Sequence, residues 1–82
     1  MVVVHRFGPF RVSIFSNDHA PAHVHVIGAG GEAKVQLVGP DAPKVIRHRG
    51  LGGNDLRRIE DEIAAEIPKL LERWLEFHGS ED

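Results

Sequence analysis

The chain has 82 residues, which leaves room for one hydrophobic core and predicts a single domain over residues 1–82. It contains no cysteine, so disulfides, thiolate zinc sites and cysteine nucleophiles are excluded, and histidine and carboxylate side chains would have to bind any metal ion. The net charge is −2, a sum that hides an asymmetry between the two halves of the chain.

No segment of the sequence resembles a targeting signal or a membrane span. The apolar run Met1–Val4 meets His5 and Arg6 at once, so it is too short for the apolar region of a signal peptide. No other apolar run approaches the length of a transmembrane helix. We therefore expect a cytoplasmic protein that does not contact the membrane.

The first elements predicted are two β-strands that form a hairpin. Val2–Val4 and Phe10–Phe15 are rich in β-branched and aromatic residues, and Gly8-Pro9 supplies the turn between them. Alternate residues of the second run are apolar, so one face of this strand is expected to pack on the core.

Two further strands and an edge strand follow in the sequence. In His23–Ile27 the valines lie on one face and both histidines on the other, and glycines at 28–31 make a turn to the matching strand Glu32–Val38. The loop at 39–43 is too rich in proline for a central strand, and Val45–His48 reads as a short edge strand. These segments, over residues 2–48, predict a mostly antiparallel sheet of three to five strands.

The C-terminal part has the pattern of an amphipathic helix over about residues 55–78. Its apolar residues recur at spacings of three and four, and the stripe they form is Leu56, Ile59, Ile63, Ile67, Leu70, Trp74 and Phe77. Asn54 is the expected N-cap and Gly79 the expected stop, whereas Pro68 predicts a kink or two consecutive helices. The fold class is therefore α+β, with this helix packed on one face of the sheet.

A cluster of histidines carries the most concentrated chemistry in the chain. His23 and His25, at positions i and i+2 of a strand, point to the same face, and Asp18 and His19 precede them in a loop. Imidazole and carboxylate groups are the ligands of catalytic zinc and of related divalent ions. One hypothesis is therefore a metal-dependent hydrolase with Asp18, His19, His23 and His25 as ligands.

A second hypothesis needs no metal ion. His23 and His25 could act as general base and general acid on a phosphodiester, with basic side chains neutralising the phosphate. Residues 1–54 hold six basic and three acidic residues, a net charge of +3, and five of the six histidines. The residues expected to bind the anion are Lys34, Arg47, His48 and Arg49.

Two non-catalytic interpretations remain open. The same groups could form a surface that binds an anion or a partner protein. Alternatively, the histidines are polar residues on the solvent-exposed face of an antiparallel sheet, and Asp18 caps a turn.

The chain resembles the bacterial domain-of-unknown-function family 4160 over nearly its whole length. The resemblance rests on Ser16-Asn17-Asp18-His19, Pro21, His23-Val24-His25-Val26, Gly31-Glu32-Ala33-Lys34 and a helix ending in Trp74 and Phe77. Two departures stand out. Ala22 occupies a position where the family usually has a second proline, and Pro68 interrupts a helix that is generally continuous.

The resemblance implies a partner protein, because members are small proteins often encoded beside another small family in arrangements like toxin–antitoxin pairs. It assigns no catalytic residues. Our first hypothesis is accordingly a toxin–antitoxin component that acts on or binds RNA through its histidine-rich strand face. The alternatives are a non-enzymatic protein-binding module, including one that forms homo-oligomers, and the metal-dependent hydrolase.

Overall fold

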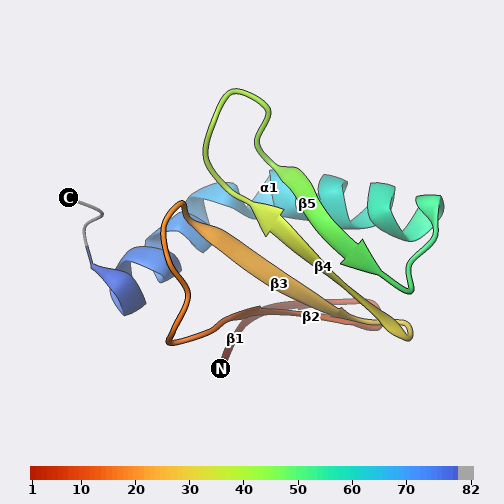
Figure 1. Ribbon diagram of the computed structural model, residues 1–82, viewed down its shortest axis with the longest axis horizontal. Coiled ribbons are helices and arrows are strands. Elements are labelled where there is room, and N and C mark those ends of the chain that lie inside the picture. Colours follow the sequence, from red (N-terminus) through yellow and green to blue (C-terminus); the bar gives the residue numbers. More distant parts are fainter. Residues whose placement is uncertain (80–82) are drawn as a thin grey trace.

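The computed structural model describes residues 1–79 and shows a five-stranded antiparallel sheet with one helix packed on it (Figure 1), which confirms the predicted α+β class. The elements in chain order are β1 (Val2–Phe7), β2 (Phe10–Ile14), β3 (His23–Gly28), β4 (Gly31–Gln36), β5 (Lys44–Arg49) and α1 (Gly53–His78). The strands predicted from the sequence are all present, with different ends.

The sheet is a meander in which each strand pairs with the next one in the chain, in the order β1-β2-β3-β4-β5. The tight turn at Gly8-Pro9 lets Phe7 pair with Phe10, so β1 runs to Phe7 and not only to Val4. At the other edge β5 pairs with β4. The register of this pair shifts between Lys34 and Val35 of β4, which pair with Arg47 and Val45 of β5. Local hairpins of this kind explain why the sheet could be predicted from turn residues and alternation.

The hydrophobic core lies between α1 and one face of the sheet. Ile59, Ile63, Leu70 and Trp74 of α1 are at most 1% exposed. They pack against alternate residues of the central strands, and these are Phe10, Val12, Ile14, Val24, Val26 and Val35. The spacing of three and four on the helix and of two on the strands therefore marks the buried faces, as predicted.

The ends of α1 agree only in part with the sequence prediction. Gly52 is the N-cap, with no side-chain cap hydrogen bond, and Asn54 lies inside the helix, where its Oδ1 accepts a hydrogen bond from Arg57 at 2.6 Å. The prediction of Asn54 as N-cap was therefore wrong. Gly79 ends the helix as predicted, and its N–H donates to the Leu75 carbonyl.

Pro68 does not divide α1, so of the two alternatives predicted at this position, a kink or two consecutive helices, the second was wrong. A proline removes the N–H that would bond to the carbonyl four residues earlier, here that of Ala64. Both Pro68 and Ala64 are exposed, so water can reach this carbonyl. No helix within residues 1–79 is long and apolar enough to cross a membrane.

The sheet face turned away from α1 carries polar side chains but is not uniformly exposed. The cross-strand pairs Ser13–His25, His25–Lys34 and Lys34–Arg47 place these four residues in one row across β2, β3, β4 and β5. Ser13 is fully buried and His25 half-buried. This row sets the position of the candidate functional site.

Candidate functional site

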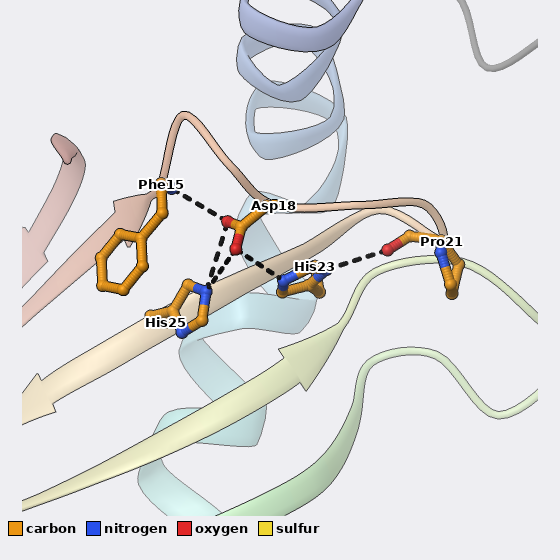
Figure 2. A network of polar contacts seen from close by, with 5 residues as sticks. All are labelled: Phe15, Asp18, Pro21, His23 and His25. Atoms are coloured by element: carbon orange, nitrogen blue, oxygen red, sulfur yellow. Dashed lines mark hydrogen bonds and ion pairs between the residues drawn. The ribbon is translucent and has the colours of Figure 1, made fainter.

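Strand β3 and the loop before it bring three of the predicted residues together. Burial of Val24 and Val26 against the core forces His23 and His25 to the other side of β3. The start of β3 is fixed because the Ala22 carbonyl accepts a hydrogen bond from the Leu37 N–H at 2.9 Å. Asp18, on the loop between β2 and β3, points toward both histidines, as Figure 2 shows.

A tight turn orients the carboxylate of Asp18. The Asp18 N–H donates to the Phe15 carbonyl at 3.1 Å, and the Phe15 N–H donates to Asp18 Oδ2 at 2.9 Å. The capping role considered from the sequence is therefore real. The carboxylate makes further contacts, because both of its oxygens also lie near His25 Nε2, at 3.0 Å (Oδ1) and 3.2 Å (Oδ2).

His23 is held in one orientation by its surroundings. Its Nδ1 lies 2.9 Å from the Pro21 carbonyl, which can only accept a hydrogen bond, so Nδ1 carries the proton. Its Nε2 lies 3.2 Å from Asp18 Oδ1. The ring also packs against Trp74, at a centroid separation of 5.2 Å, and the residue is 4% exposed. The sequence does not indicate this burial.

His25 is positioned by Asp18 and by Phe15. The Phe15 and His25 rings stack with their centroids 4.1 Å apart and their planes at 5°. One face of the imidazole is therefore covered, and its Nε2 is fixed against the carboxylate. Phe15 directly follows β2 and, two residues after Ser13, lies on the same face as Ser13. Because Ser13 pairs with His25, alternation in the sequence indicates that Phe15 is near His25, although the stacking of the two rings was not predicted.

The environment of Asp18 favours its ionised form. Burial alone would raise the pKa of Asp18, but the hydrogen bond from the Phe15 amide, the hydrogen bond from His25 and the charges of both histidines outweigh it and lower the pKa below the ordinary 3.8. The carboxylate is therefore negative throughout the neutral range. It provides a fixed charge between two imidazoles.

This lowered pKa predicts a dependence of stability on pH. Because the pKa of Asp18 is lower in the folded than in the unfolded state, ionisation stabilises the fold above about pH 3.8, and this contribution is lost as pH falls through the folded value. We expect Asp18→Asn to be less stable than wild type at pH 7 and the difference to shrink below pH 4. Urea unfolding in EDTA at both pH values measures it, and a constant difference would contradict the assignment.

The four residues predicted to bind an anion line one groove on the sheet. Lys34, Arg47, His48 and Arg49 surround a groove of about 530 Å³ together with Phe15, His25, Ile27, Ala33 and Glu32. Glu32 pairs with Arg49 at 3.0 Å. The groove therefore holds three cationic side chains, those of Lys34, Arg47 and Arg49, and one carboxylate. The groove is therefore basic, and His25 lies in its wall.

Three predicted residues, Asp18, His19 and His23, do not line this groove. His19 is exposed and is not among the side chains whose ligand atoms meet, since that group consists of Asp18, His23 and His25. His19 and His23 line a second, smaller depression of about 210 Å³. The structure therefore brings His23 and His25 to Asp18, yet it places only His25 in the basic groove.

Comparison with known proteins identifies a family. A family model described as a domain of unknown function, DUF4160, matches residues 10–75, a span that includes the whole site. No curated protein and no solved structure matches the chain.

Proposed function

This chain belongs to the DUF4160 family, and from this premise we propose that it is a toxin–antitoxin component that binds RNA and cleaves it with His25 as the general base. The observation that supports this proposal is the basic groove, in which His25, held by Asp18, lies beside Lys34, and Arg47 lies on the strand beyond Lys34. A small partner protein completes the proposed pair.

The charge of the groove suits a polyanion. Lys34, Arg47 and Arg49 come from two adjacent strands, so their charges follow the sheet and do not converge on one point. With Glu32 opposing them, the net charge of the groove is +2 when His25 and His48 are neutral. A row of cations along an open groove fits successive phosphates of a strand better than a single small anion.

His25 has the arrangement of a general base. Its Nε2 donates to the Asp18 carboxylate in the neutral ring, which leaves the lone pair on Nδ1. A carboxylate that fixes the tautomer and orientation of a histidine in this way supports proton abstraction, here from the ribose 2′-hydroxyl of bound RNA. The 2′-oxygen then attacks the adjacent phosphorus, the bond from phosphorus to the 5′-oxygen breaks, and the 5′-oxygen leaves with a proton from water, giving a 2′,3′-cyclic phosphate. His23 lacks this freedom, because its Nδ1 is bonded to Pro21 and the residue is buried.

RNA binding tests the groove. We expect the wild-type chain to bind a single-stranded oligoribonucleotide with an affinity that falls with salt, at a slope of roughly −2 in log–log form for three phosphate contacts. Lys34→Ala and Arg47→Ala should each weaken binding and reduce that slope by about 0.7. Fluorescence anisotropy between 50 and 300 mM salt measures both quantities.

The control is Arg57→Ala, which removes an equal charge from the exposed surface of α1, away from the groove. This variant should bind RNA like the wild type. If the wild type does not bind RNA, or if all three variants weaken binding equally, the groove is not the RNA site.

A further inference from the structure

We infer that Asp18, His23 and His25 form a binding site for a divalent transition-metal ion such as Zn²⁺. The inference goes beyond the proposed function and does not depend on RNA binding. It concerns the point where one carboxylate oxygen meets two ring nitrogens, and it rests on the tautomer of His23, the distances among the three side chains and the groups that hold them.

The hydrogen bonding of His23 leaves two acceptor atoms facing each other at this point. Since Nδ1 donates its proton to the Pro21 carbonyl, Nε2 of a neutral His23 carries a lone pair. That lone pair lies 3.2 Å from Asp18 Oδ1, which is itself an ionised acceptor (Figure 2). Two acceptors this close repel each other in a buried site unless a proton or a metal cation lies between them.

The distances among the three side chains suit a metal ion. Asp18 Oδ1 lies 3.2 Å from His23 Nε2 and 3.0 Å from His25 Nε2, and one ligand atom from each residue falls within 4.8 Å of the others. Ligand atoms about 2.0–2.1 Å from a tetrahedral zinc ion are roughly 3.3 Å apart. The two distances from Asp18 Oδ1 are close to this separation, and the two histidine nitrogens, within 4.8 Å of each other, would approach to bind one ion.

The donor set and its supporting contacts are those of a metal site. Two imidazoles and a carboxylate suit Zn²⁺ and the neighbouring divalent ions. Each ligand is oriented by a further group, since Pro21 bonds His23, the Phe15 amide bonds Asp18 and the Phe15 ring stacks on His25. Fixed ligands of this kind reduce the entropy lost when an ion binds.

The site also has room for a fourth ligand. Asp18 and His23 both line the depression of about 210 Å³, so a water molecule or a substrate oxygen can reach an ion bound there. Three protein ligands with one open position are typical of catalytic zinc and not of structural zinc. In the metal-bound form His25 Nε2 is a ligand and no longer donates to Asp18, so the metal-free pair and the metal site are two alternative states of one cluster.

Isothermal titration of the EDTA-treated full chain with ZnCl₂ at pH 7.5 tests the inference. We expect one ion per chain. Asp18→Asn and His23→Gln each replace a ligand, so each should weaken zinc binding by at least about 10–100-fold, which is the loss typical when only a residue that orients a ligand is replaced. His19→Ala is the matched control, because it removes an exposed neighbouring histidine and should retain wild-type affinity. Circular dichroism establishes that each variant is folded.

A spectroscopic measurement on the wild type avoids any folding defect of the buried His23 variant. Long-range ¹H–¹⁵N NMR spectra should show zinc shifting Nε2 of His23 and of His25, while His23 Nδ1 keeps its proton. Absence of equimolar binding, loss of binding in His19→Ala but not in Asp18→Asn, or zinc shifts at other histidines alone would each overturn the inference. Since no RNA is present, a failure here leaves the groove proposal untouched.

Discussion

Replacing Trp74 with alanine is expected to lower the free energy of unfolding by about 3–5 kcal/mol, the range for removing a buried tryptophan side chain. Trp74 is 1% exposed and packs against the rings of both His23 and His78. A domain of 82 residues has a total stability of only roughly 4–12 kcal/mol. The variant should therefore be partly unfolded at 37 °C, with a melting temperature lowered by more than about 10 °C.

Packing accounts for this cost. The Trp74 Nε1 is buried and makes no hydrogen bond within residues 1–79, so its removal leaves no acceptor unpaired. Because no hydrogen bond is lost and part of the apolar contact is kept, Trp74→Phe should lower the free energy of unfolding less than Trp74→Ala does.

The neighbouring residue provides the control. Leu75 lies on the same helix but is 50% exposed, so Leu75→Ala should change the stability by less than about 1 kcal/mol. Thermal and urea unfolding, followed by circular dichroism, measure all three variants. A Trp74→Ala protein as stable as Leu75→Ala would show that α1 does not pack on the sheet as described.

Replacing His25 with glutamine is expected to reduce the rate of RNA cleavage by about 10²–10⁴-fold, which is the contribution typical of a positioned general base. RNA affinity should change little, because Lys34, Arg47 and Arg49 remain in the groove. Single-turnover cleavage of a labelled oligoribonucleotide, with the protein in excess and EDTA present, separates the chemical step from binding.

Two comparisons make this result specific. Lys34→Ala should reduce cleavage mainly through weaker binding, so saturating protein should restore much of its rate, whereas His25→Gln should stay slow at any concentration. Arg57→Ala, on α1, should cleave like the wild type. Cleavage by His25→Gln at the wild-type rate would rule out His25 as the base, and cleavage that occurs only without EDTA would point to the metal-bound state of the cluster.

Local patterns in the sequence were sufficient for most of the fold. Alternation in β2 and β3, glycine-containing turns and the spacing of apolar residues in α1 all act over a few residues, and a meander joins neighbours in the chain. The errors concerned Asn54 as N-cap and one of the two alternatives predicted at Pro68, a division into two helices. The Asn54 side chain bonds to Arg57 while Gly52 is the N-cap, and Pro68 lies at an exposed position within one continuous helix.

The sequence by itself also determined which face of β3 holds His23 and His25, because a period of two forces both to the side opposite the buried valines. Only the tertiary structure decided which groups meet there. The turn at Phe15 aims Asp18 at both histidines and leaves His19 in solvent, and the Trp74 ring of α1 packs against the ring of the buried His23. The pairing of β4 with β5 places Lys34, Arg47 and Arg49 in the groove whose wall includes His25. These contacts join residues distant in the chain, so they depend on packing and register, which no local pattern specifies.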